Sequence, residues 1–285
     1  MKQILVISGK GGTGKTTILA SFAALAKNPV VADCDVDAPD LHLVLKPEIK
    51  KTIDFSGSKV AVKDNSRCVD CGKCREVCRF DAASENFNID YTLCEGCKAC
   101  VFVCPVDALK LEEKISGQAY ISETKYGPMA HAKLNIGEEA SGKLVAVVKE
   151  NVKKIAEKEN KNLILIDGSP GIGCPVIASL SGVDLAVVVS EPTVSGIHDL
   201  KRILSVAKHF GVNSALCINK YDINLENTKD IEKFCEKEGI EIAGKIPFDT
   251  VVTEAMVAEK PVVEFSNGKV SQEIISMWNK INTSI

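Results

Sequence analysis

Eight of the twelve cysteines in this chain of 285 residues lie in one short stretch, where they form a repeated pattern. Each of two runs has the spacing C-x2-C-x2-C-x3-C, and every cysteine of the first run recurs 26 positions later. The residues are Cys68, Cys71, Cys74 and Cys78, followed by Cys94, Cys97, Cys100 and Cys104. No export signal precedes them, and clustered cysteines in such a chain indicate metal ligands before disulfides. We therefore expect metal binding to supply much of the folding energy of this small segment.

The double motif resembles the signature of bacterial two-cluster ferredoxins. In that pattern three closely spaced thiolates bind one cubane, and the fourth cysteine of each run binds the other. The resemblance implies two 4Fe-4S clusters, one held by Cys68, Cys71, Cys74 and Cys104, the other by Cys94, Cys97, Cys100 and Cys78. The alternatives are disulfides and zinc ribbons, but zinc sites usually take two separated pairs of ligands. Arg79 stands where the motif usually has proline, which alters local hydrogen bonding but removes no ligand.

A second motif precedes the cysteines. Residues 9–16 fit G-x-x-x-x-G-K-[ST], and they lie between a buried apolar run at 3–7 and a helical stretch at 17–26. Glycines let backbone N–H groups curl around phosphates, and the start of the next helix adds partial positive charge. Lys15 is expected to reach the β- and γ-phosphates and Thr16 to bind Mg²⁺. The sequence thus predicts ATP and Mg²⁺ as ligands, with nucleotide contacts from Gly11, Gly12, Thr13, Gly14, Lys15, Thr16 and Thr17.

An additional lysine, Lys10, stands near the start of this loop. The string from residue 9 to 17 resembles the deviant Walker A loop of the MinD/ParA superfamily of P-loop ATPases. In that superfamily the early lysine reaches the nucleotide of a partner subunit. The resemblance therefore implies an ATP-sandwich homodimer, and it makes Lys10 and Lys15 catalytic candidates. The alternative for Lys10 is a solvated loop lysine.

Acidic residues follow two buried runs. Asp33, Asp35 and Asp37 close the second run, and they resemble the acidic switch of the family. The resemblance assigns to Asp35 the positioning of magnesium and the attacking water, and to Asp33 a supporting place in the metal shell. Asp37 is expected only to cap a turn. Asp167 ends the run at 163–167, where a carboxylate suits a magnesium-bound water.

Two further segments match the family by position. Residues 168–173 resemble its second switch loop. Asn219 and Pro247 stand where the family contacts adenine, although an Asn-Lys pair is also an ordinary turn. These residues complete the predicted nucleotide site.

Buried apolar runs alternate with helical stretches along the rest of the chain, which predicts a mostly parallel α/β sheet covered on both faces. The expected organisation is a P-loop ATPase domain at 1–59 and 114–285, interrupted by an inserted α+β ferredoxin-like domain at 60–113. The net charge of −3 gives no reason to expect a nucleic-acid surface. No apolar run approaches the ~20 residues of a membrane span. We therefore expect a cytoplasmic protein.

Four cysteines and a histidine remain. Cys174 lies seven residues after Asp167, which resembles a cluster-binding switch cysteine of the nitrogenase iron protein; the alternative is a small buried residue at a turn. Cys34 is either redox-sensitive or inert, and Cys217 and Cys235 are expected in the core. His131 is expected to be structural.

Together these features predict a protein that binds and hydrolyses ATP and couples this reaction to electron transfer through two clusters. The second hypothesis is an iron–sulfur cluster or metal-cofactor carrier, because the chain also resembles the Mrp-type carriers. A third is a MinD-like spatial organiser, although the chain lacks a basic amphipathic helix for membrane docking. The partner that takes the electron or the cluster is not identified by the sequence.

Overall fold

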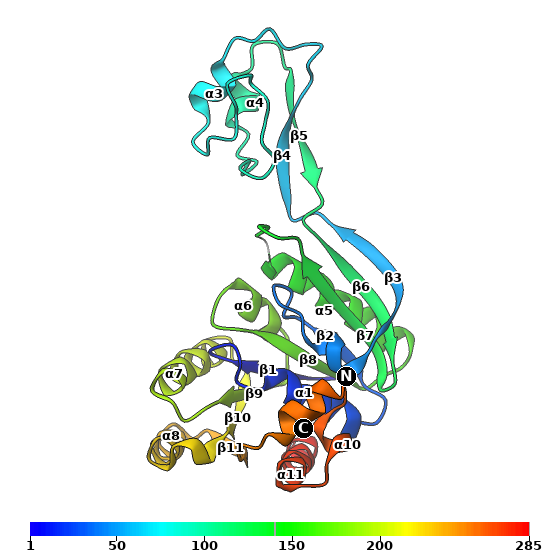
Figure 1. Ribbon diagram of the computed structural model, residues 1–285, viewed down its shortest axis with the longest axis vertical. Coiled ribbons are helices and arrows are strands. Elements are labelled where there is room, and N and C mark those ends of the chain that lie inside the picture. The colour runs from blue at the N-terminus through cyan, green and yellow to red at the C-terminus, as the bar shows by residue number, and fades with distance from the viewer. Residues whose placement is uncertain (140, 285) are drawn as a thin grey trace. The chain divides into compact units, whose positions relative to one another are not determined.

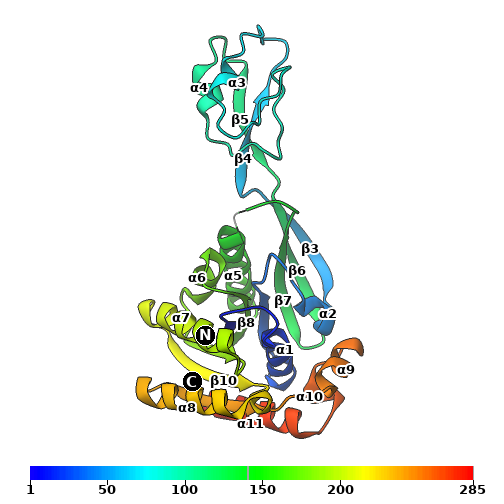
Figure 2. The ribbon, with the colours of Figure 1, turned by 60° about the vertical axis from the view of Figure 1, so that its left-hand side comes forward.

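The protein, in a computed structural model, is described for residues 1–139 and 141–284, and it divides into two compact units. Unit 1 comprises residues 1–52, 119–133 and 141–284 of this range. Unit 2 comprises residues 53–118 and 134–139. Figures 1 and 2 show a layered α/β architecture for unit 1 and a small, loop-rich one for unit 2.

A nine-stranded sheet forms the centre of unit 1. The strands β1, β2 and β7 to β11 pair with one another in parallel. For example, β1 is parallel to both of its neighbours, β8 and β9. The strand order is β11 (Glu241–Ile246), β10 (Asn213–Asn219), β9 (Leu185–Ser190), β1 (Lys2–Ser8), β8 (Leu163–Pro170), β2 (Val30–Asp33), β7 (Gly127–Leu134), β6 (Gly117–Thr124) and β3 (Glu48–Phe55).

Helices cover both faces of this sheet, because its central strands are apolar on both sides. Ile4 and Val6 of β1 share a core cluster with α1 (Lys15–Leu25) and α11 (Lys269–Ser284). Their neighbours Leu5 and Ile7 are equally buried and point to the opposite face. On that face α5 (Ser141–Lys158), α6 (Cys174–Leu180) and α7 (Val194–His209) contact the strands, and α8 (Leu225–Glu238) packs on β11 (Figure 2).

Shorter elements complete unit 1. They are α2 (Leu41–Leu45), the 3-10 turn η1 (Tyr221–Ile223), α9 (Val251–Val257) and α10 (Val262–Phe265). Phe22 of α1 lies against Trp278 of α11, with ring centroids 5.1 Å apart. The mostly parallel sheet and its covering helices confirm the predicted P-loop ATPase fold. No helix among the described residues is long and apolar enough to cross a membrane.

Unit 2 contains a two-stranded antiparallel ladder of β4 (Ser58–Lys63) and β5 (Leu109–Lys114). Two one-turn helices, α3 (Lys73–Val77) and α4 (Ala99–Val103), pack against each other. Its buried apolar residues are few and half of them are alanine: Phe55, Val60, Ala61, Ala82, Ala83, Ala108, Leu109 and Leu134. So small an apolar core gives this unit little stability of its own.

Unit 2 is wider than the stretch 60–113 expected from the cysteine spacing. The ladder of β4 and β5 starts at Ser58 and extends to Lys114. Lys114 donates to the carbonyl of Tyr91 at 2.9 Å and also forms an ion pair with Glu138. Residues 134–139 therefore join unit 2 through contacts that no cysteine motif indicates.

Candidate functional site

The phosphate loop connects β1 to α1, at the carboxyl edge of the sheet. Gly14 has a left-handed φ of +91°, and a side chain there would lie 2.5 Å from the amide nitrogen of Asn219. Only glycine suits this position, because it tolerates both the backbone conformation and the close approach. Lys15, the first residue of α1, is nearly buried, with 5% of its surface exposed. The loop thus has the conformation and the cation that a phosphate site needs.

Two buried carboxylates lie beside this loop. Asp33 and Asp167 are paired in register on the adjacent parallel strands β2 and β8, so both stand at the carboxyl edge. Burial raises the pKa of Asp167, although the charge of Lys15 and a hydrogen bond from Thr16 oppose the increase. Burial, followed by the charge of Asp167, also raises the pKa of Asp33. This edge therefore concentrates buried acidic groups, whose charge Lys15 offsets only in part.

The oxygens of Asp167 fit a magnesium site. The Thr16 hydroxyl donates to Oδ2 of Asp167 at 2.7 Å. Oδ1 of Asp167 is buried and accepts no hydrogen bond from the described residues. A hydroxyl and an orphaned carboxylate oxygen form the kind of hard oxygen set that Mg²⁺ prefers. Thr16 and Asp167 are thus the residues that would hold the cation, directly or through water.

The acidic switch shows a division of roles. Both oxygens of Asp33 accept backbone N–H groups, from Asp35 at 3.0 Å and from Leu41 at 3.3 Å. Asp33 therefore anchors the loop that carries Asp35. Burial raises the pKa of Asp35 to about 6, with Lys15 opposing. Asp37 is exposed.

A pocket of about 200 Å³ lies next to the phosphate loop. It is lined by five of the residues predicted to contact the nucleotide, Gly12, Gly14, Thr17, Asn219 and Pro247. The amide of Asn219 donates to the carbonyl of Thr13 at 2.8 Å and accepts from the backbone of Lys220 at 3.0 Å. Asn219 thus ties the phosphate loop to the end of β10 and forms one wall of the pocket.

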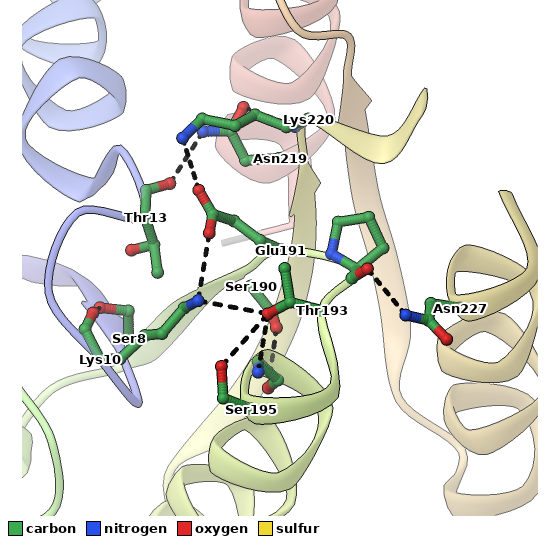
Figure 3. A network of polar contacts seen from close by, with 12 residues as sticks. Ser8, Lys10, Thr13, Ser190, Glu191, Thr193, Ser195, Asn219, Lys220 and Asn227 are labelled. Atoms are coloured by element: carbon green, nitrogen blue, oxygen red, sulfur yellow. Dashed lines mark hydrogen bonds and ion pairs between the residues drawn. The ribbon is translucent and has the colours of Figure 1, made fainter. Parts of the chain in front are cut away.

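The side chain of Lys10 forms polar contacts with other residues of the same chain (Figure 3). Its ammonium lies 3.3 Å from Oε2 of Glu191 and donates to the Thr193 hydroxyl at 3.2 Å. Glu191 also pairs with Lys220 through its other oxygen at 2.6 Å. Sequence reasoning did not single out Glu191 or Thr193. Their position directly after the buried strand β9 was a usable signal, since carboxyl ends of parallel strands meet at one edge.

The cysteine segment repeats its local structure as well as its sequence. Helices α3 and α4 lie 26 positions apart. Backbone φ is positive at the matched pairs Asp70 and Gly96, with 50° and 61°, and Gly72 and Lys98, with 77° and 70°. Each half thus places its first three cysteines on the same loop-and-helix scaffold.

Backbone hydrogen bonds also join the two halves of the cysteine segment in a reciprocal way. The N–H of Asp64 donates to the carbonyl of Ala108 at 2.8 Å, and that of Asp90 to Ala82 at 2.7 Å. Asp90 follows Asp64, and Ala108 follows Ala82, by the same 26 positions. This exchange relates the halves by an approximate two-fold. Such an arrangement brings the fourth cysteine of each run to the other half.

Two small pockets result. One is lined by Cys94, Cys97, Cys100 and Cys78, and the other by Cys68, Cys71, Cys74 and Cys104, with Cys74 bordering both. These are the two sets of four that the ferredoxin pattern predicts. Backbone N–H groups point at sulfur, from Ala61 to Cys94 at 3.4 Å and from Ala108 to Cys104 at 3.2 Å. Such hydrogen bonds to sulfur are among the features that set cluster potentials.

Neither pocket has the geometry of a site for a single ion. Within the described range, no three His, Cys, Asp or Glu side chains converge closely enough to hold one metal ion. Zinc needs its thiolates at about 2.3 Å from one centre, whereas a cubane separates its thiolates around a larger body. The eight cysteines are free and at least partly exposed. These eight cysteines form no disulfide, so each set of four has thiols available to hold a metal group.

The remaining cysteines and His131 lie apart from these pockets. Cys34, Cys217 and Cys235 are buried, and burial raises the pKa of each thiol, which keeps it protonated and unreactive. Cys174 is exposed at the first position of α6, so the alternative of a buried turn residue is wrong. His131 is buried and exchanges a hydrogen bond with Ser122 at 2.9 Å, which is a structural arrangement.

Comparisons with known proteins agree with this geometry. The model of the CobQ/CobB/MinD/ParA nucleotide binding domain matches residues 4–262. An uncharacterized protein of Methanocaldococcus jannaschii is 37% identical over 99% of this chain and 97% of its own length. The pyruvate synthase subunit PorD of the same organism is 42% identical over 52 residues, covering 17% of this chain and 60% of that subunit. The MinD structure of Pyrococcus horikoshii complexed with Mg-ADP aligns with a TM-score of 0.62 and 17% identity over 99% of this chain and 96% of that one.

Proposed function

This chain belongs to the CobQ/CobB/MinD/ParA nucleotide-binding family, and from that premise we propose that it is an ATP-hydrolysing iron–sulfur protein. ATP binding and turnover in a homodimer are coupled to electron transfer through two 4Fe-4S clusters. The observation that carries the proposal is that one chain contains both a phosphate loop and two pockets, each lined by one complete set of four cysteines.

The nucleotide half rests on the loop and its neighbours. Lys15 and the loop N–H groups bind the phosphates, and the 200 Å³ pocket between Thr17, Asn219 and Pro247 receives the base. Thr16 and Asp167 hold Mg²⁺, which would neutralise phosphate charge when bound. We assign to Asp35, whose pKa burial raises to about 6, the orientation of the attacking water. The reaction releases ADP and phosphate.

The cluster half rests on the pockets and on a partial similarity. The fourth cysteines, Cys78 and Cys104, lie with the opposite triads, as two-cluster ferredoxins require. The similarity to PorD extends over 52 residues, about the length of the cysteine segment. When bound, the clusters supply one-electron carriers, and the surrounding N–H donors and apolar side chains set their potentials.

Coupling between the halves requires only a modest free energy. A shift of ~59 mV in a one-electron potential corresponds to about 1.4 kcal/mol. Ordering of switch loops by a nucleotide supplies differences of this size. We propose that nucleotide state changes cluster potential, partner docking, or both.

The test is an EPR-monitored redox titration of anaerobically purified protein, with and without MgATP. We expect about eight irons per chain and a cluster potential or partner-reduction rate that depends on nucleotide. Protein that stays iron-free after reconstitution would contradict the redox half. Cluster potentials and partner-reduction rates that are the same with and without MgATP would contradict the coupling of ATP to electron transfer.

One observation favours a second candidate, a cluster carrier. Cys174 is exposed directly after the second switch loop, where a partner subunit's copy could share a labile cluster. In that case iron would leave the holoprotein for an apo-ferredoxin acceptor in an ATP-dependent manner, and a Cys174→Ser variant would lose this transfer. Retention of transfer in that variant would rule out Cys174 as the donor site.

A further inference from the structure

Lys10, Glu191 and Lys220 form a network of three charged side chains, and most of it lies outside the predicted site. Glu191 follows β9, Lys220 follows β10, and Lys10 belongs to the loop after β1 (Figure 3). The side chain of Glu191 is only 10% exposed, and it separates the two ammonium groups. Thr193 accepts a hydrogen bond from the Gly196 N–H and so caps α7. Its hydroxyl also accepts a hydrogen bond from the ammonium of Lys10.

The two ion pairs of Glu191 are unequal. Its contact with Lys220 is 2.6 Å, whereas its contact with Lys10 is 3.3 Å. A buried carboxylate that loses its last cation is strongly destabilising. If Lys10 leaves, however, Glu191 keeps the shorter pair with Lys220. The network therefore allows Lys10 to depart without leaving an unpaired buried charge.

We propose that Glu191 is a positioning residue that holds Lys10 on its own subunit, and that Lys220 lowers the cost of releasing it to the partner's nucleotide. The inference rests on the proposed ATP-sandwich dimer. It adds to that dimer the residue from which Lys10 must separate, Glu191, and the cation that remains paired with Glu191, Lys220.

The nucleotide supplies the driving force for this exchange. A ligand shifts an equilibrium only through its different affinity for the two states. A triphosphate carries several negative charges, whereas Glu191 carries one. The electrostatic attraction of Lys10 to the partner's nucleotide is therefore stronger than its attraction to Glu191. Lys220 also lines the 200 Å³ pocket, so the residue that retains Glu191 belongs to the wall of the nucleotide site.

This arrangement predicts opposite effects from two substitutions. Glu191→Gln removes the charge that holds Lys10 and keeps the side-chain shape. Lys220→Met removes the competing cation, which leaves Glu191 dependent on Lys10. We expect the first variant to dimerise at lower protein concentration and the second at higher. A merely structural role would weaken the dimer in both.

The experiment measures the dimer dissociation constant by analytical ultracentrifugation of the holoprotein at saturating Mg-AMPPNP. We expect a decrease of about fivefold for Glu191→Gln and an increase of similar size for Lys220→Met, each corresponding to ~1 kcal/mol. Glu191→Asp should stay near the wild-type value. Glu232→Gln, which removes a partly exposed carboxylate paired with Lys245, is the charge-matched control.

A second pair of variants isolates Lys10. Lys10→Met and the double variant Lys10→Met with Glu191→Gln should have equal dissociation constants, because Glu191 acts only through Lys10. Dimerisation weakened by Glu191→Gln, or unchanged, would overturn the inference. Binding of a fluorescent ATP analogue is measured in parallel: wild-type protein that binds no nucleotide contradicts the proposed function itself, whereas normal binding with unaltered dimerisation contradicts only the role of Glu191.

Discussion

Lys15 provides the clearest single-residue test of the nucleotide site. Its ammonium is nearly buried at the start of α1, where it opposes the raised pKa values of Asp35 and Asp167. A hydrogen bond to a charged partner is worth about 1.5–3 kcal/mol. Lys15→Ala should therefore weaken ATP binding by roughly 10- to 100-fold, measured by calorimetry. Lys27→Ala, at an exposed lysine beyond α1, is the control; unchanged affinity for Lys15→Ala would contradict the site.

His131 makes the stability of unit 1 depend on pH. Burial, with a smaller contribution from the charge of His42, lowers the pKa of His131 to about 4. The unfolded chain, with a histidine pKa of about 6.5, binds the proton first, so stability falls as pH drops from about 6.5 toward 4. The loss from this residue is of order 3 kcal/mol.

A His131→Gln variant isolates this effect. The variant starts less stable because it loses the stacking on Tyr120, but its free energy of unfolding should fall less steeply over the same pH window. Denaturant titrations monitored by Trp278, the single tryptophan of the chain, give both slopes. Parallel slopes would show that His131 does not titrate in this way.

At the scale of elements, the 26-residue repeat of unit 2 predicts matched variants. Cys71 and Cys97 hold equivalent positions before α3 and α4, and each lines only one of the two pockets. Cys71→Ala and Cys97→Ala should each lose one cluster, about four irons, and retain ATP binding. Iron analysis and low-temperature EPR distinguish the two remaining clusters. Loss of all iron in both variants would instead show that the clusters assemble as one unit.

The elements also show what sequence patterns reveal. Strands β1, β2, β8, β9 and β10 were predicted because continuous apolar runs mark strands buried on both faces. Strand β11 was predicted from the run at 240–243, which Glu241 interrupts. The strands β7, β6 and β3, which follow β2 in the strand order, were not. The reason is plain in β3, whose residues up to Thr52 are exposed, so that no apolar run or clean alternation marks it.

The residues of the nucleotide site also fall into those that the sequence predicts and those that it does not. Residues fixed by a motif, such as Lys15 and Thr16, were identified because the chemistry requires their spacing. Glu191 was missed because its role depends on β9 lying next to β1, which is a property of the strand order rather than of local sequence. The two backbone hydrogen bonds of Asp33 depend on the loop conformation, so the sequence alone does not reveal that this side chain anchors the loop.

For the whole molecule, the two units differ in what holds them together. Unit 1 has a large apolar core, in which Phe22 packs on Trp278. Unit 2 buries few apolar side chains, half of them alanines, and burial of an alanine contributes little compared with a leucine or phenylalanine. The folding free energy of unit 2 must therefore come largely from its metal, as in other small metal-binding domains.

Iron removal should consequently unfold one unit and spare the other. We expect chelation under anaerobic conditions to raise hydrogen exchange across residues 64–108 to the level of an unfolded chain. Trp278 lies in unit 1, so the denaturant midpoint read from its fluorescence should stay the same, and ATP should still bind. Protection that persists across 64–108 in the iron-free protein would mean that alanine packing and the β4–β5 ladder suffice to fold unit 2. A midpoint that falls with iron removal would mean that the two units unfold cooperatively.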